Sequence, residues 1–259
     1  MKSIMIFNQK GGVGKSTTSG NIMAELTARK FKVLGIDLDG QGHLTKFLGV
    51  NTNDENTMYE LLSGEATFAD TVKSTKYGDL LPCDEVLQRN MLVFASDPTF
   101  QGRMQEVLAN VKDNYDYAII DCPPALNQVT LSALVAANYL IIPTEAERFS
   151  IDGVSQIIET INKVRGNNRL NPDLRVMGLL ITKYSGRRIM TRSAEKTLDR
   201  VAKELLDSKV FQTKISNLSD IPYSQAEGVS VKDYKTKSKS AKEYESLVDE
   251  ILTEIKKNG

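Results

Sequence analysis

The chain has 259 residues, of which 41% are hydrophobic and 25% charged, a composition that excludes a disordered or collagen-like protein. No apolar run approaches the roughly 20 residues that span a bilayer, and the start of the chain lacks the apolar stretch and cleavage site of a secretory signal. The two cysteines, Cys83 and Cys122, have no metal-ligand spacing and need no disulfide in a reducing compartment, so we predict a cytoplasmic protein.

The formal net charge is zero, but the charges are unevenly distributed. Between Lys183 and Lys242 there are 14 Lys and Arg against 7 Asp and Glu, a net of +7, so the remainder carries −7. Such an asymmetry indicates a polyanionic partner for one face, although solvated helix faces explain it equally well.

Short apolar runs alternate along the chain with helical patterns. The predicted strands are 3–7, 32–38, 91–95, 117–121, 139–143 and 176–182. The predicted helices are 16–29, 57–63, 101–112, 127–137, 150–165, 189–207 and 240–257. This order predicts an α/β fold with a doubly wound, mainly parallel sheet covered by helices on both faces. We expect a single domain over 1–259 with no separate N-terminal helix-turn-helix domain, and a ligand site at the carboxyl ends of the strands.

A glycine-rich loop, "KGGVGKST" at 10–17, follows the first predicted strand and opens the first helix. Backbone N–H groups and a helix N-terminus converge on an anion in such a loop. Lys15 would reach the β- and γ-phosphates, and the Ser16 hydroxyl would bind Mg²⁺. The strict G-x-x-x-x-G-K-[ST] pattern fails because Gln9 occupies the first glycine position, and the alternative is a glycine turn with incidental lysines. The predicted nucleotide-binding residues here are Gly11, Gly12, Val13, Gly14, Lys15, Ser16 and Thr17.

Carboxylates follow two of the predicted strands. Asp121 ends the strand 117–121, where it would hold Mg²⁺ directly or through water, unless it only caps the strand. Asp37 is nearer the strand end than Asp39, and we expect it to support the same metal site from behind. His43, the only histidine, is interpreted as a surface or loop residue rather than a catalytic one.

Four segments together resemble the ParA/MinD family of ATPases. "KGGVGKST" looks like the deviant phosphate loop of that family, and "GIDLDGQGHLT" at 35–45 is similar to its second conserved element. "YAIIDCPP" at 117–124 resembles its Walker B strand, and "LLITKYSGR" at 179–187 resembles the strand and loop near the adenine. The resemblance extends over nearly the whole chain. One departure is Gly40, which stands where the family often has proline and predicts a looser loop.

This resemblance implies a P-loop NTPase fold, ATP and Mg²⁺ as cofactors, and an ATP-dependent homodimer. In the family, the lysine matching Lys10 crosses the dimer interface to the partner's phosphates, and the residue matching Asp39 orients the attacking water. A cation from a partner subunit would stabilise charge in the manner of an arginine finger. Thr182 and Lys183 match residues near the adenine, and the segment from Ile215 to Glu227 would flank the base.

The resemblance to ParA proteins further implies binding of non-specific duplex DNA, a nucleoid-associated location, a weak ATPase stimulated by a ParB-like centromere-binding protein, and no membrane partner. The DNA-binding residues expected on this basis are Arg187, Arg188, Arg192, Lys235, Lys237 and Lys239. A solubilising lysine tract is the alternative, and Asp220 stands near a position where relatives often carry a basic residue.

Two other functions remain open from the sequence: a MinD-like positioning ATPase, and a metabolic P-loop enzyme of the dethiobiotin synthetase type. A MinD-like protein would end in a basic amphipathic helix that inserts into lipid. Here the apolar stripe of the last predicted helix has acidic flanks, so we expect it to pack on the domain. The stripe consists of Leu247, Ile251, Leu252 and Ile255.

Overall fold

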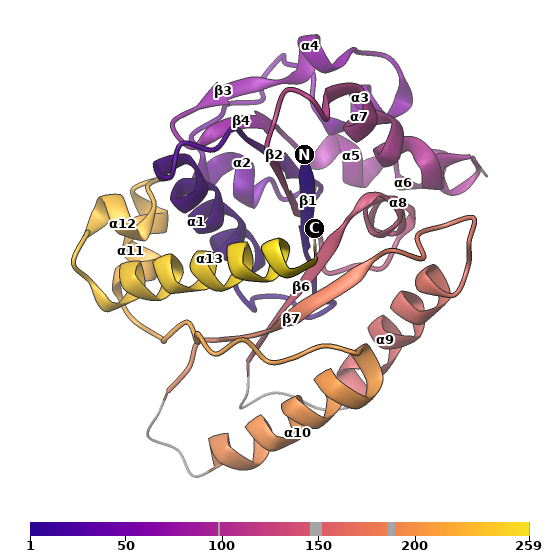
Figure 1. Cartoon of the computed structure of the whole chain (residues 1–259). Helices are drawn as coiled ribbons and strands as arrows, with labels where there is room; N and C mark the ends of the chain where they lie inside the picture. Colours follow the sequence, from indigo (N-terminus) through magenta and orange to yellow (C-terminus); the bar gives the residue numbers. More distant parts are fainter. Residues whose placement is uncertain (98, 146–151, 186–189, 259) are drawn as a thin grey trace.

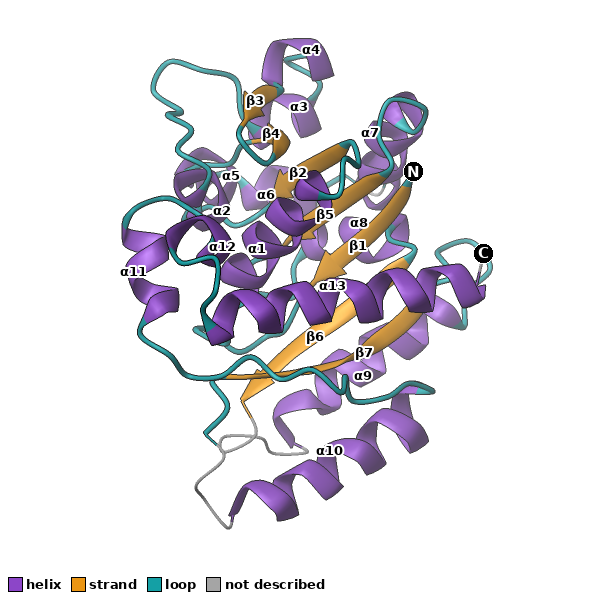
Figure 2. Cartoon of the chain, turned by 60° about the vertical axis from the view of Figure 1, so that its left-hand side comes forward, coloured by secondary structure: helices purple, strands orange, loops and turns teal. Residues whose placement is uncertain are grey.

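The computed structural model describes residues 1–97, 99–145, 152–185 and 190–258, without the side chains of 152–155, 190–194 and 258. At its centre lies a seven-stranded sheet in the order β3-β4-β2-β5-β1-β6-β7 (Figures 1 and 2). Its neighbouring strands are parallel except for the antiparallel pair β3 and β4. The strands are β1 (Lys2–Ile6), β2 (Val33–Asp37), β3 (Lys73–Thr75), β4 (Gly78–Leu81), β5 (Tyr117–Asp121), β6 (Tyr139–Glu145) and β7 (Arg175–Thr182). The predicted doubly wound α/β fold is confirmed.

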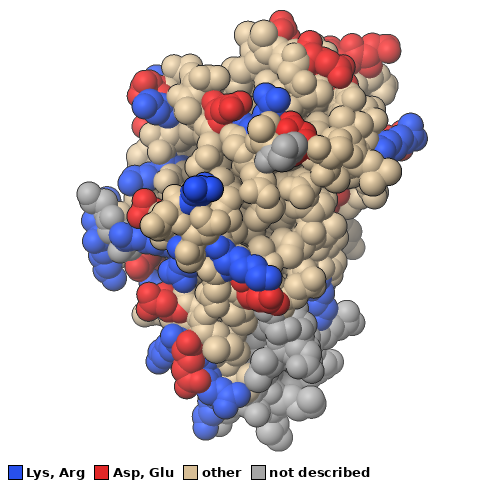
Figure 3. Space-filling view, turned by 90° about the vertical axis from the view of Figure 1, so that its right-hand side faces the viewer, with Lys and Arg blue, Asp and Glu red and all other residues tan. Residues whose placement is uncertain are grey.

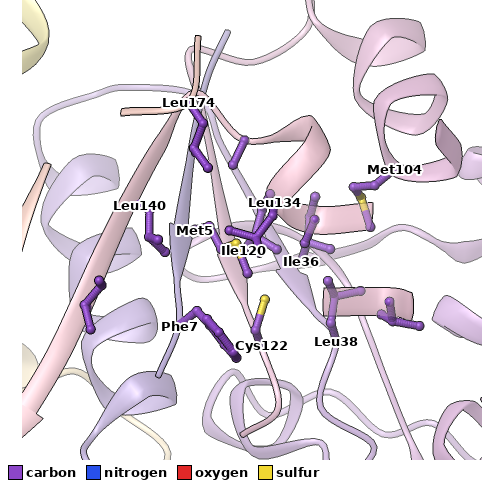
Figure 4. Close-up of a cluster of buried hydrophobic side chains, with 14 of the residues drawn as sticks. Met5, Phe7, Ile36, Leu38, Met104, Ile120, Cys122, Leu134, Leu140 and Leu174 are labelled. Carbon is purple, nitrogen blue, oxygen red and sulfur yellow. The ribbon is translucent and has the colours of Figure 1, made fainter. Parts of the chain in front are cut away.

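Helices cover both faces of the sheet, because successive strand residues point to opposite sides. From β1, Ile4 and Ile6 face a core formed with α1, α2, α12 and α13, whereas Met5 and the following Phe7 face a core formed with α3 and α5 to α10. Figure 4 shows part of the second core. The helices are α1 (Lys15–Ala28), α2 (His43–Phe47), α3 (Met58–Ser63), α4 (Phe68–Thr71), α5 (Glu85–Arg89), α6 (Met91–Ala95), the 3₁₀ turn η1 (Phe100–Gly102), α7 (Arg103–Val111), α8 (Gln128–Ala136), α9 (Asp152–Arg165), α10 (Met190–Leu206), α11 (Asp220–Ala226), α12 (Val231–Tyr234) and α13 (Lys239–Asn258).

The apolar stripe of α13 lies against α1 and the sheet, as expected (Figure 2). Leu247 and Ile251 are fully buried in that core, Ile255 is 7% exposed, and Leu252 packs at its edge. The stripe is therefore occupied by the packing of the protein itself. Among the described helices, none has both the length and the apolar character needed to cross a membrane.

The predicted strand at 91–95 is wrong, because these residues form the helix α6. A run of five apolar residues has no period that separates strand from buried helix. The strand that pairs with β2 on the side away from β5 is β4. It belongs to a short β3–β4 hairpin that was not predicted from the sequence. In α6, Phe94 is buried and stacks on Phe100 with ring centroids 4.3 Å apart, whereas Leu92 is 84% exposed.

Candidate functional site

The phosphate loop connects β1 to α1 at the carboxyl edge of the sheet. Gly12 (φ 74°) and Gly14 (φ 83°) adopt left-handed backbone conformations that side chains disfavour, so the path of the loop depends on glycine there. Asn8 fixes the loop to the sheet. Its side-chain oxygen accepts from the Lys10 N–H at 3.0 Å, and its amide donates to the Pro143 carbonyl at 2.7 Å. The helix N-terminus that follows is a ready anion site.

Lys15 opens α1 with a side chain that is only 7% exposed. Its Nζ donates to the carbonyl of Lys10 at 3.2 Å. Burial lowers the pKa of Lys15, while the nearby carboxylates of Asp121 and Asp39 act in the opposite direction. An ammonium group held in this way is pre-positioned for an anionic partner, which forms stronger hydrogen bonds than a carbonyl.

Two carboxylates stand side by side at the ends of β2 and β5, where Asp37 pairs in register with Asp121. Both residues are fully buried. Burial raises the pKa of both carboxyl groups, and the neighbouring Asp37 raises that of Asp121 further. The Asp121 Oδ1 accepts from the Ser19 hydroxyl at 2.9 Å, whereas its Oδ2 has no hydrogen-bond partner among the described residues.

The oxygens of Asp37 are engaged differently. Its Oδ2 accepts from both the N–H and the hydroxyl of Thr45 at 2.8 Å, and its Oδ1 accepts from the Asp39 N–H at 3.1 Å. Asp37 therefore supports the loop 38–42, here called the switch loop, while Asp121 retains an unpaired oxygen. Within the described part of the chain, no group of three or more His, Cys, Asp or Glu side chains could hold a metal alone. That arrangement fits Mg²⁺, which usually takes one or two carboxylates, waters and phosphate oxygens.

Asp39 lies in the switch loop and is 8% exposed. Its Oδ1 accepts from the Gln41 N–H at 3.0 Å. Next to it, Gly40 is tightly packed, since a Cβ there would stand 2.6 Å from the Cβ of Gln88 on α5. The Gln41 side chain also donates to Gln88 Oε1 at 3.2 Å. Glycine at position 40 thus permits a close approach of α5, a reason that the sequence did not supply.

On its other side, away from the switch loop, the phosphate loop contacts the end of β7 and the segment 215–225. The Thr182 hydroxyl donates to the Val13 carbonyl at 2.9 Å, and Lys183 pairs with Glu145 at 2.9 Å. From α11, the amide of Gln225 donates to the Thr17 hydroxyl at 2.7 Å. These contacts place α11 across the start of α1.

These elements surround a cavity of about 800 Å³, the size of a nucleotide-binding pocket. Of the predicted residues, those lining it are Gly11, Gly12, Gly14, Lys15, Ser16, Thr17, Asp39, Thr182 and Lys183. Val13, Asp37 and Asp121 are buried behind the lining. Lys10 belongs to the loop but does not line the cavity of its own chain. His43 is exposed at the rim, as interpreted from the sequence.

Several lining residues were missed by sequence reasoning. Leu87, Gln88 and Met91 come from α5 and α6, and no motif marks them. The N-cap residue Asp84, whose side chain accepts from the Val86 N–H, was the available signal for a helix start. Within the segment 215–227, Ile215 to Leu218 and residues of the helix α11 line the cavity, and the contact of this segment with the base stays a prediction.

The chain is similar to known proteins over nearly its whole length. Residues 1–176 match the family model described as "AAA domain". The chain is 34% identical to the sporulation initiation inhibitor protein Soj of Bacillus subtilis, over 96% of this chain and 98% of Soj. It is 32% identical to the chromosome partitioning protein ParA of Caulobacter vibrioides, over 98% of this chain and 94% of ParA. The chain belongs to the ParA/MinD family of P-loop ATPases.

Solved structures of this ParA/MinD fold include relatives with bound nucleotide. The cobyrinic acid a,c-diamide synthase of Mycobacterium smegmatis, solved with bound ADP and magnesium, superposes with a TM-score of 0.85 at 31% identity. That match covers 100% of this chain and 97% of the synthase. The fold is thus shared by family members whose names describe different functions.

Among the basic residues expected to contact DNA, the described lysines Lys235, Lys237 and Lys239 do not line the cavity. Arg187 and Arg188 fall outside the described residues, and Arg192 lies in α10 without a described side chain. Lys235, Lys237 and Lys239 are exposed between α12 and the start of α13. Two of them have acidic neighbours: Lys235 pairs with Asp220 at 3.4 Å, and Lys239 pairs with Glu243 at 3.5 Å. On the face shown in Figure 3, acidic side chains gather at the upper end, and Lys and Arg are more frequent below.

Proposed function

We propose that this protein is a Mg²⁺- and ATP-dependent partition ATPase whose ATP-bound dimer binds nucleoid DNA in the cytoplasm. The observation that carries the proposal is the grouping of three charged side chains behind a glycine loop: Lys15 and Asp39 line the cavity, and Asp121 is buried next to Lys15 behind that lining. The full-length similarity to Soj and ParA supports it. A DNA-binding protein without a nucleotide switch would not need all three groups.

The residues around the phosphate loop fit a Mg·ATP complex. The unpartnered, buried Oδ2 of Asp121 is a polar atom that requires a partner, and Mg²⁺ held directly or through water provides one. The Ser16 hydroxyl lies close to Asp121 and lines the cavity, so it would complete the protein side of the metal site. Bound magnesium would neutralise charge on the phosphates, and Lys15 would bind their β- and γ-oxygens. Asp37 would hold the switch loop rather than the metal.

Asp39 is the residue that we assign to hydrolysis. Its carboxylate lines the cavity beside Lys15, and its orientation is fixed by the Gln41 N–H. A carboxylate in this place would orient the attacking water without needing to be a strong base.

Lys10 would act on the partner subunit's nucleotide. Support comes from its position in the loop combined with its absence from the lining of its own cavity. A lysine donated across the interface makes ATP part of the contact between two subunits, and loss of the γ-phosphate weakens that contact. A ParB-like partner would accelerate this step.

A mixing experiment tests the shared site directly. Lys10→Ala and Lys15→Ala should each lose most ATPase activity. A mixed dimer retains one complete site, formed by the intact Lys15 of the Lys10→Ala subunit and the intact Lys10 of the other. Phosphate release should therefore recover on mixing, whereas activity no higher than the sum of the two separate variants would contradict the account.

The DNA step is tested by duplex binding with Mg·ATP, with ADP and without nucleotide, over a salt series. We expect tight binding with ATP alone, weakening steeply as salt rises. The same duplex affinity in all three nucleotide states would contradict the proposed switch.

A second candidate is a metabolic ATP-dependent enzyme, which the similarity to cobyrinic acid a,c-diamide synthase favours. We prefer the partition function because the segment 183–242 has a net charge of +7, which a small-substrate enzyme does not require. ATPase activity without DNA binding in any nucleotide state would favour the metabolic candidate.

A further inference from the structure

A second, shallower hollow of about 370 Å³ lies beside the main cavity. Its lining includes three lysines, Lys214, Lys239 and Lys242, against one carboxylate, that of Glu243. We call this hollow, with Tyr184 and Ser216, the lysine groove. Hydroxyl and amide side chains complete its lining, so it is polar and cationic, as a phosphate-binding surface must be.

The lysines of the groove differ in how firmly they are held. Lys214 pairs with Glu195 at 2.7 Å, and its Nζ lies 4.6 Å from the centre of the Tyr184 ring. Lys239 is 67% exposed and makes a long contact with Glu243. Lys242 is exposed, and no ion pair joins it to another described residue. The groove therefore has one pre-positioned cation and one that needs an anionic partner.

One thin wall separates the groove from the main cavity. The segment 214–218 is bonded along Tyr184, whose N–H donates to the Ile215 carbonyl at 2.9 Å and whose carbonyl accepts from the Asn217 N–H at 3.0 Å. Lys214 lines the groove, Ile215 lines the main cavity, and Ser216 lines both. A single backbone segment therefore contributes side chains to both sites.

Glu243 clamps that wall from α13. Its carboxylate accepts from the Ser216 N–H at 2.9 Å and from the Ser216 hydroxyl at 2.6 Å. The same carboxylate faces Lys239, and the next residue, Tyr244, lines the main cavity. The start of α13 therefore also contributes to both sites.

We propose that the lysine groove binds a backbone phosphate of duplex DNA, and that Glu243 couples its occupancy to the main cavity through the segment 214–218. The inference rests on the proposed function, because it names the place where the polyanion binds and how the nucleotide site senses it. A phosphate between Lys214 and Lys242 also attracts Lys239, which alters the charge that faces Glu243 and its hold on Ser216. By linkage, nucleotide and DNA then change each other's affinity by the same factor.

The groove is tested with Lys242→Gln, which removes one charge and no described ion pair. In the full-length protein with Mg·ATP, duplex affinity should fall by about threefold to tenfold at low salt, and the slope against salt should decrease by about one per groove. Lys112→Gln is the matched control, because Lys112 is exposed at the opposite edge, between α7 and β5, and should leave both quantities unchanged. Equal behaviour of the two variants would overturn the groove while leaving the partition function intact. Absence of duplex binding by the unmodified protein in every nucleotide state would overturn both.

The coupling is tested with Glu243→Gln, which keeps the size of the side chain and removes its charge. ATP affinity is measured with and without saturating duplex. The unmodified protein should show a coupling of about fivefold or more, and Glu243→Gln should bring this ratio close to one, whatever its ATP affinity without DNA. An unchanged coupling factor would overturn the role of Glu243.

Discussion

The cavity has two walls that are built differently. The phosphate wall consists of the loop 8–17 with the carboxylates that end β2 and β5, and its key side chains are nearly all buried and hydrogen-bonded. The other wall consists of α5, the start of α6 and the segment 215–225, and we call it the base wall because 215–227 is expected to flank the base. Several of its lining residues, such as Pro222 and Gln225, are exposed. The phosphate wall is a short, continuous motif supported by the sheet, whereas the base wall is assembled from distant segments.

Because of this difference, we expect the two walls to contribute unequally to nucleotide binding. Charged groups in a buried, low-dielectric wall interact strongly with phosphate, and each is expensive to remove. Hydrogen bonds at an exposed wall exchange with water and contribute less individually. We therefore expect substitutions in the phosphate wall to abolish function and those in the base wall to adjust affinity.

The largest effect is expected for Lys15→Ala. Removing a buried ammonium from a phosphate site typically costs about 2–5 kcal/mol, so ATP affinity should fall by about 30-fold or more. Titration with a fluorescent ATP analogue measures it. Lys46→Ala is the control, since Lys46 is an exposed lysine at the rim of the same cavity that donates to the Gln41 carbonyl. Comparable losses in both variants would mean that general positive charge, rather than the buried group, sets affinity.

Asp39→Asn should separate hydrolysis from binding. The amide preserves the size of the side chain and an oxygen to accept from the Gln41 N–H, but it removes the charge that would orient water. We expect the rate of phosphate release to fall by about 10²–10⁴-fold, with ATP affinity within about threefold of the parent protein. A variant that hydrolyses ATP at the parental rate would remove Asp39 from the mechanism.

The phosphate wall could be predicted from the sequence because its residues are contiguous and chemically distinctive. Lys15, Ser16 and Asp121 follow apolar strands, and parallel strands bring their carboxyl ends to one edge. The distinction between Asp37 and Asp121 needed coordinates, because only the structure shows which oxygens Thr45 and Asp39 already occupy.

Thr45→Val tests the support of the phosphate wall. The buried Thr45 hydroxyl donates to Asp37 and accepts from the Cys83 N–H at 3.0 Å, so valine leaves both partners short of a hydrogen bond. We expect the free energy of unfolding to fall by about 1–3 kcal/mol, and hydrolysis to slow by about tenfold because Asp39 is misplaced. Thr45→Ser retains the hydroxyl, so it should recover most of the stability and most of the hydrolysis rate. Urea denaturation measures the first and phosphate release the second. A serine variant as impaired as the valine variant would assign the effect to packing.

The base wall was harder to predict because it depends on packing between distant segments. The run at 91–95 was predicted as a strand but forms α6, and the preceding helix α5 lies against the switch loop through Gln88 and Gly40. That contact joins residues 48 positions apart, and neither has a distinctive pattern. Likewise, α11 is absent from the predicted helices, and its contact with α1 has no sequence signal.

The smallest effect is expected for Gln225→Ala, which removes the hydrogen bond from α11 to the Thr17 hydroxyl. The bond joins the base wall to the phosphate wall, but Gln225 is exposed and water replaces the lost donor. A neutral hydrogen bond is typically worth about 0.5–1.5 kcal/mol, so ATP affinity should fall by about twofold to tenfold, with no change in stability. Gln105→Ala, which removes a comparable bond to the Val135 carbonyl far from the cavity, should leave ATP affinity unchanged. A loss as large as that of Lys15→Ala would mean that the two walls act as one cooperative unit, and the contrast between them would fail.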